Sequence, residues 1–93
     1  DHPLQLLAAL ITRYRQLLMV KALVARGVSP REGAGQAKMH PFAFEKTVGY
    51  VRSYPRYELV AALEKLMHAD QAIKSGFDPK LTLETCVVDL MGA

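Results

Sequence analysis

The chain has 93 residues, of which 51% are hydrophobic and 23% are charged, and it contains a single cysteine. This composition is typical of one small globular domain, and it excludes a disordered segment and a disulfide-bonded scaffold. The net charge of +3 permits contact with nucleic acid but does not indicate it, because Lys and Arg are scattered along the sequence.

The sequence shows no signal peptide and no membrane span. Its longest apolar-rich run, Leu4 to Ile11, is too short to cross a bilayer and is followed by Arg13 and Arg15. With one thiol and no signal, we expect a reducing compartment, the cytoplasm. Because the chain begins Asp1-His2-Pro3 without a methionine, we interpret it as a piece of a longer protein.

Leu and Ala far outnumber Val and Ile, which favours helices over strands. A first helix is predicted from Leu4 to Arg26, with Gly27 as its stop signal. A second begins after Ser29, a good N-cap, with Pro30 at its first position. Two internal glycines weaken this second helix, so we expect it to be short or irregular.

Three further helices are predicted, and each begins at a proline. They run from about His40-Pro41 to Tyr54, from about Pro55 to Ser75-Gly76, and from Asp78-Pro79 to about Met91. No period-two alternation is long enough for a strand. The prediction is therefore an all-α fold, a compact bundle of about five helices forming a single domain over residues 1–93.

The first helix is apolar on more than one face. A wide arc is formed by Leu7, Leu10, Ile11, Tyr14, Leu17, Leu18, Val24 and Ala25. On the other side, Met19, Val20 and Leu23 form a second apolar strip. Such a helix is either surrounded by the other helices or touches a partner, so these three residues are candidates for an interface.

Two charges of opposite sign lie inside apolar stripes. Lys21 falls near the middle of the first helix's arc, and Asp70 falls near the centre of the fourth helix's apolar face. A buried charge is costly unless it is paired, so we predict a structural ion pair between Lys21 and Asp70. In the alternative, Asp70 pairs with Lys74 one turn later and Lys21 reaches solvent.

The sequence predicts no catalytic, metal or cofactor site, and therefore no enzyme. The three histidines have no ligand spacing, and the paired glycines Gly33 and Gly35 follow no strand and lack a Lys-Ser/Thr partner. Cys86 falls among Leu83, Val87 and Leu90 on an apolar face, as a buried, inert thiol does.

The segment from Ser29 to Tyr54 allows a second functional hypothesis. Two short helices joined by a turn, the second of them basic, are typical of a helix-turn-helix nucleic-acid-binding domain. Its candidate phosphate contacts are Lys38, His40, Lys46 and Arg52. Phe42 and Phe44, however, begin the would-be recognition helix where polar side chains are expected. Phe42 fits a protein partner at least as well, so it joins the interface candidates.

Taken in order, three segments resemble a known family. They read "LLAALITRYRQLLMVKALVARGVSPRE", "MHPFAFEKTVGYVRSY" and "LEKLMHADQAIKSGFDPKLTLETCVVDL". The more specific features are the run Arg13 to Leu18 before Lys21, His40-Pro41-Phe42 with Lys46, and Asp70-x-x-x-Lys74-x-Gly76. This set resembles the C-terminal domain of the delta subunit of the bacterial DNA polymerase III clamp loader.

The resemblance implies a helical collar domain that follows two ATPase-type domains in a longer subunit. It implies assembly with the gamma/tau and delta prime subunits into a five-membered loader that places the sliding clamp on primed DNA. Contact with the clamp and with DNA would then be made through the rest of the complex. The expectation is a non-catalytic oligomerisation domain without cofactor, and no membrane partner.

Overall fold

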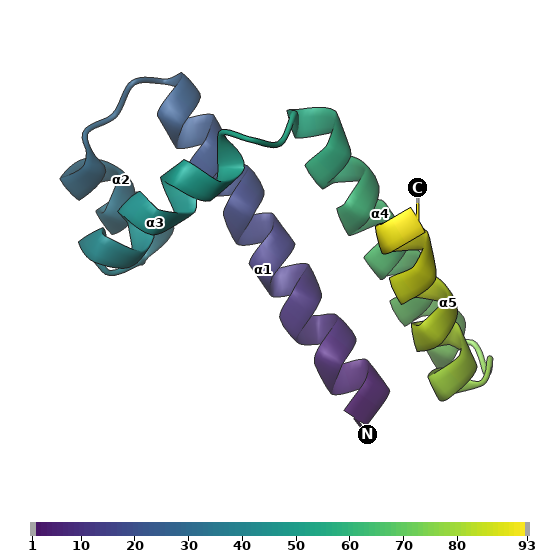
Figure 1. Ribbon diagram of the computed structural model, residues 1–93. Helices are drawn as coiled ribbons and strands as arrows, with labels where there is room; N and C mark the ends of the chain where they lie inside the picture. The colour runs from purple at the N-terminus through teal and green to yellow at the C-terminus, as the bar shows by residue number, and fades with distance from the viewer. Residues whose placement is uncertain (1, 93) are drawn as a thin grey trace. The chain divides into compact units, whose positions relative to one another are not determined.

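The structure is a computed structural model that describes residues 2–92, and within them it contains five helices and no strand. The helices are α1 (His2–Ala25), α2 (Pro30–Ala37), α3 (Pro41–Val51), α4 (Arg56–Lys74) and α5 (Pro79–Gly92) (Figure 1). The predicted all-α class and the predicted number of helices are confirmed. The largest difference is at the end of α3, which stops at Val51 instead of Tyr54.

The helix ends follow from local side-chain chemistry. Ser29 caps α2, since its hydroxyl accepts a hydrogen bond from the Glu32 amide at 3.2 Å. Asp78 caps α5 in the same way, accepting from the Leu81 amide at 2.8 Å. Gly27 and Gly76, which follow α1 and α4, adopt positive φ angles of 75° and 107°. These are the left-handed conformations that end a helix and that glycine adopts without strain.

The chain packs as two compact units, and the boundaries between them fall inside α1 and α4. One unit comprises Asp1–Tyr14 and Ala61–Ala93, and the other comprises Arg15–Val60. We call them the terminal unit and the central unit and describe each by itself. That the chain forms a single domain stays a prediction.

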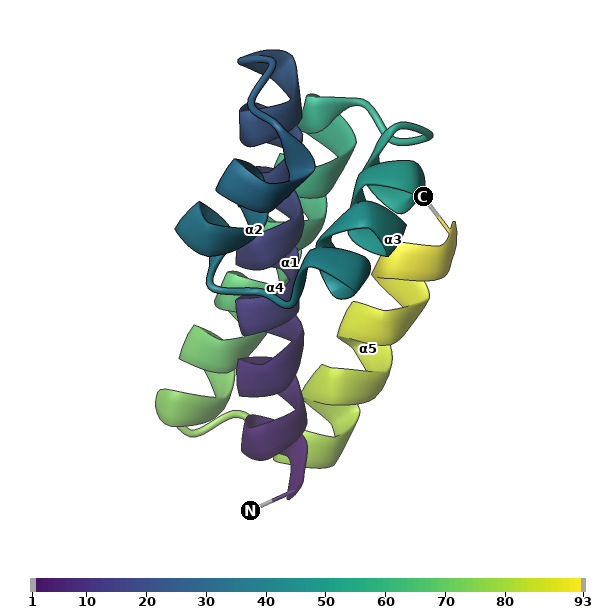
Figure 2. The ribbon, with the colours of Figure 1, turned by 90° about the vertical axis from the view of Figure 1, so that its left-hand side faces the viewer.

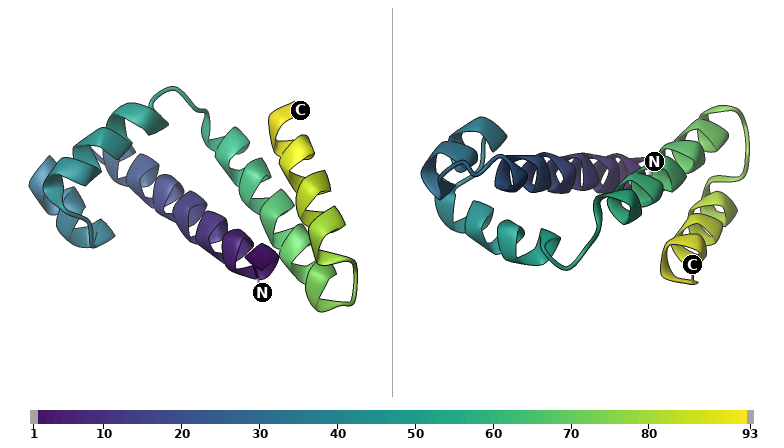
Figure 3. Two further views of the ribbon diagram at one scale, coloured as in Figure 1. Left: turned by 60° about the horizontal axis from the view of Figure 1, so that its bottom comes forward. Right: turned by 90° about the horizontal axis from the view of Figure 1, so that it is seen from above.

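The terminal unit has a core shared by α1, α4 and α5. Its buried side chains are Leu7, Leu66, Ala69, Ile73 and Cys86, with Leu4, Leu10, Ile11, Tyr14, Leu83 and Leu90 packed around them. Figure 1 and Figure 3 show α4 and α5 running side by side in opposite directions. The apolar stripes of the first and fourth helices therefore do pack together in this unit.

The central unit is built on the second half of α1. Its buried residues are Leu17, Val20, Leu23, Ala34, Phe44, Thr47, Val51 and Leu59. Figure 2 shows α3 beside this half of α1, and α2 packs on α3. Helix α2 is short, as predicted, but it is a regular α-helix of eight residues.

Gly33 has a packing role that the sequence did not reveal. It is buried, and a Cβ atom at this position would overlap the ring of Phe44 on α3. The glycine that weakens α2 as an isolated helix is thus the residue that lets α3 approach it. Gly35, two residues later, is exposed and faces open space.

Candidate assembly surfaces

The four interface candidates divide into two exposed and two buried residues. Phe42 is 67% exposed and Met19 is 49% exposed. Val20 and Leu23, in contrast, are buried at 0% and 4% exposure. They are core residues of the central unit because its own helices cover that side of α1, so they offer no free surface to a partner.

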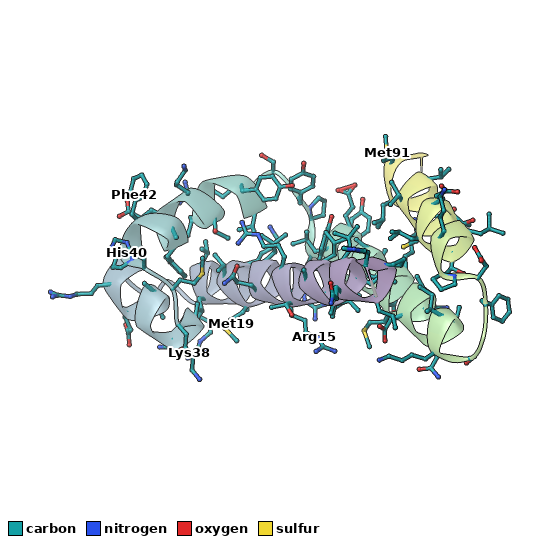
Figure 4. All side chains as sticks on the ribbon, turned by 90° about the horizontal axis from the view of Figure 1, so that it is seen from below. Arg15, Met19, Lys38, His40, Phe42 and Met91 are labelled. Atoms are coloured by element: carbon teal, nitrogen blue, oxygen red, sulfur yellow. The ribbon has the colours of Figure 1, made fainter. Side chains whose placement is uncertain are left out.

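Met19 and Phe42 do not form one continuous patch. Figure 4 shows Phe42 at one edge of the central unit, beside His40, and Met19 at the other edge, near Lys38. Phe42 lies in the first turn of α3, where its amide donates to Nδ1 of the N-cap His40 at 3.1 Å. The ammonium group of Lys46, one turn on, lies 5.4 Å from the centre of its ring, a cation–π contact. Phe42 is thereby held in place but remains open to solvent.

The outer face of α5 is an apolar surface that the sequence analysis missed. Leu81, Val88 and Met91 are 62%, 66% and 81% exposed. They fall within about 80° of one another on a helical projection, at roughly 100° per residue. Leu83, Cys86 and Leu90 lie on the opposite, core-facing side. The sequence could have revealed this surface. Helix α5 carries apolar residues on two faces, and only one of those faces is needed to pack against α4.

An open groove of about 680 Å³ lies between α4 and α5. Small and apolar side chains line it, including Ala61 and Ala72, with polar groups such as Glu64 and His68 among them. Leu81 lies at the edge of the outer α5 face and also lines the groove. Within the described residues, no group of three His, Cys, Asp or Glu side chains could hold a metal ion. The groove thus combines small and apolar side chains with several polar groups.

Cys86 is buried and is one of the residues that line this groove. Its thiol donates to the Lys65 carbonyl oxygen at 3.7 Å, and the Lys65 ammonium group donates to the Asp89 carbonyl oxygen at 3.1 Å. Burial raises the pKa of the Cys86 thiol, the Asp89 carboxylate raises it further, and Lys65 opposes the shift. The thiol therefore stays protonated and behaves as a small apolar core group, as predicted.

Lys21 and Asp70 each have a partner within their own unit. The Lys21 ammonium group donates to the backbone oxygen of Val51, the last residue of α3, at 2.9 Å. A cation at this position interacts favourably with the carbonyl groups at the helix C-terminus. Asp70 forms an ion pair with Lys74 at 2.8 Å. The direct pair between Lys21 and Asp70 stays a prediction.

Positive charge is concentrated in the central unit. Residues 15–60 contain eight Lys and Arg against three Glu, whereas the rest of the chain contains four against six Asp and Glu. The mild net charge of the whole chain hides this difference. The basic residues are spread along the sequence, but the central unit holds twice as many of them as the rest of the chain.

The comparisons with known proteins agree with this all-α fold. No helix in residues 2–92 is long and apolar enough to span a bilayer. The chain belongs to the family described as "DNA polymerase III delta subunit, C-terminal domain", whose model matches residues 1–90. The resemblance found in the sequence is thus confirmed.

Two matches, one in sequence and one in structure, support this assignment, and both are to a Bacillus subtilis delta protein. The chain is 26% identical over 92 residues to a protein described as DNA polymerase III subunit delta, and the match covers 98% of the chain and 26% of that relative. A solved structure, the B. subtilis DNA clamp loader delta protein (YqeN), matches with a TM-score of 0.90 and 26% identity. That match covers 100% of the chain and 28% of the solved one. The chain thus spans about a quarter of each relative, and neither match supports a helix-turn-helix domain.

Proposed function

We propose that this domain is the oligomerisation collar of a clamp-loader delta subunit. In this role it holds the subunit in a pentameric loader with the gamma/tau and delta prime subunits, in the cytoplasm. The loader places the sliding clamp on primed DNA, and clamp contact belongs to the rest of the complex. The domain itself performs no reaction.

The outer face of α5 carries this proposal. Fully burying a side chain of this kind stabilises an association by about 1.5–3 kcal/mol. Leu81, Val88 and Met91 are more than half exposed, so most of that free energy is still available to a contact. The interfaces of obligate assemblies are apolar in this way, and each side of such an interface resembles half of a domain core.

The test is a charge placed on this face in the full-length subunit. Val88→Glu and Met91→Glu are expected to weaken assembly with the other loader subunits at least tenfold, measured by native mass spectrometry and size-exclusion chromatography. Gln71→Glu, on an exposed turn of α4, adds the same charge elsewhere in the unit and is the matched control. Both α5 variants should keep the helical circular dichroism of the parent. Normal assembly of both would refute the proposal for this face.

A second set of variants tests the two exposed candidates from the sequence. Met19→Glu and Phe42→Glu leave the core intact, so any loss of assembly reports on contact at those sites. Leu23→Glu is unsuitable for this purpose, because Leu23 is buried and a carboxylate there would unfold the central unit.

A further inference from the structure

We infer that the junction between α3 and α4 binds single-stranded nucleic acid by base stacking. The segment of residues 50–57 reads "YVRSYPRY" and contains three tyrosines and two arginines. We call it the Tyr-Arg segment. It lies entirely within the central unit. Aromatic rings that alternate with cations are the usual components of surfaces that bind unpaired strands.

The rings of the Tyr-Arg segment are presented to solvent. Tyr57, in the first turn of α4, is 73% exposed, and Tyr50 on α3 is half exposed. Tyr50 and Tyr54 are already paired, with ring centroids 5.1 Å apart and planes inclined by 48°. The Tyr54 amide also bonds to the Val51 carbonyl oxygen at 3.2 Å, which fixes the turn after α3. The segment therefore offers aromatic faces on an ordered backbone.

The charges beside these rings suit a phosphate backbone. Arg52 and Arg56 are both exposed and alternate with the tyrosines. No acidic residue occurs between Lys46 and Tyr57, although Glu45 and Glu58 border the stretch. The surrounding unit has an excess of five positive charges. Such a field raises the local concentration of a polyanion and weakens as salt is added.

The geometry favours an unpaired strand over a duplex. In a duplex both faces of each base are covered by its neighbours, so a tyrosine ring has no base face to stack on. Single strands expose those faces, and stacking on them tolerates any base sequence. Tyr and Arg are also common in protein interfaces, but the positive charge of the Tyr-Arg segment specifically complements phosphate. A protein contact is therefore kept as the competing outcome of the test.

The test uses the full-length subunit and fluorescence anisotropy with labelled 20-nucleotide oligo(dT), at 50 and 200 mM salt. Tyr50→Leu with Tyr57→Leu removes the two most exposed rings, and we expect binding to weaken at least tenfold. The matched control, Tyr50→Phe with Tyr57→Phe, keeps the rings and should bind within about twofold of the parent. Arg52→Gln with Arg56→Gln should reduce the slope of log K against log salt by about 1.4, or 0.7 for each phosphate contact.

Two further arms define the ligand. Oligo(U) distinguishes RNA from DNA, since a surface that reads only base faces should bind both alike. A duplex of the same length should bind more weakly and without dependence on the two rings. Absence of measurable oligo(dT) binding by the parent, or equal binding by the Leu and Phe variants, would overturn the inference.

This inference does not rest on the collar role, and the two fail separately. The Leu double variant should assemble into the loader as the parent does, while losing oligo(dT) binding. If it instead keeps oligo(dT) binding and fails to assemble, the Tyr-Arg segment is a protein contact and the inference is wrong. Failure of the α5 variants to affect assembly would leave the oligo(dT) result unchanged.

Discussion

The two glycines of α2 allow a matched test of how the central unit packs. In the interior of a helix, Gly→Ala normally stabilises a protein by about 0.5–1 kcal/mol, because alanine loses less backbone entropy on folding. Gly35→Ala should show this gain, since position 35 faces open space. Gly33→Ala should show the opposite sign, because its methyl group would enter the space occupied by the Phe44 ring.

The size of the loss at Gly33 follows from the packing around it. Phe44 is 2% exposed, so its ring has little room to move away from a new methyl group. Adding a methyl group to such a core typically costs about 1–3 kcal/mol. After the helix gain is subtracted, Gly33→Ala should destabilise the unit by up to about 2.5 kcal/mol. For a domain of this size, 1 kcal/mol corresponds to a shift of about 4–8 °C in Tm.

Urea denaturation followed by circular dichroism measures both variants on the same chain. A double variant, Gly33→Ala with Phe44→Leu, gives the decisive control. The shorter leucine should accept the methyl group, so the alanine should cost less in this background than in the parent. If Gly33→Ala stabilises the chain as Gly35→Ala does, then α2 and α3 are not in close contact at this point and the reasoning is refuted.

Three further predictions concern polar groups. Lys21→Met should lower the free energy of unfolding by about 1.5–3 kcal/mol, because it removes a charged donor from a helix-end carbonyl. Asp70→Asn should lower it by less than about 1 kcal/mol, because the Asp70–Lys74 pair is partly exposed. A coupling above about 1 kcal/mol between the two substitutions, in a double-mutant cycle measured in urea, would instead support the direct pair. His40→Ala should lower the urea midpoint by the equivalent of about 0.5–1 kcal/mol, and His40→Asp should restore it, since aspartate is a better N-cap. Because burial raises the pKa of the Cys86 thiol, the unfolded chain ionises first as the pH rises. Stability should therefore fall above about pH 8.5, a slope that Cys86→Ala should remove in denaturation curves measured from pH 7 to 10.

The helix boundaries were the part of the structure that the sequence predicted best. Ser29, Asp78 and Gly76 act through their own backbone neighbours, within three residues in each case. The physical cause of a cap is local, so a local pattern is sufficient to find it. Gly33 shows where this reasoning ends. A glycine lowers the stability of α2 taken alone. Its packing role depends on Phe44, which lies eleven residues later in the chain, on another helix.

The interface candidates show a second limit. Helical periodicity identifies which residues share a face, and it assigned Val20 and Leu23 to a second face of α1. The structure buries both of them in the same core as Leu17, which belongs to the main apolar arc. Periodicity does not say whether that second face is covered by the chain itself or by a partner. The central unit covers these two residues with its own helices and leaves Met19 exposed. The same reasoning, applied to α5, would have identified Val88 as an outward-facing apolar residue.

Lys21 shows that a charged residue can have a partner that the sequence does not display. An apolar side chain needs only any apolar neighbour, but an ammonium group needs an acceptor at a defined point in space. The sequence offers carboxylates as visible candidates, and Asp70 was the natural choice. It does not display backbone carbonyl groups, although every helix ends with up to four that lack partners. In the structure Lys21 bonds to one of these, the Val51 oxygen at the end of α3. A lone cation inside an apolar arc therefore predicts the approach of a helix C-terminus as well as it predicts an acidic side chain, and the position of a helix end depends on how the helices pack.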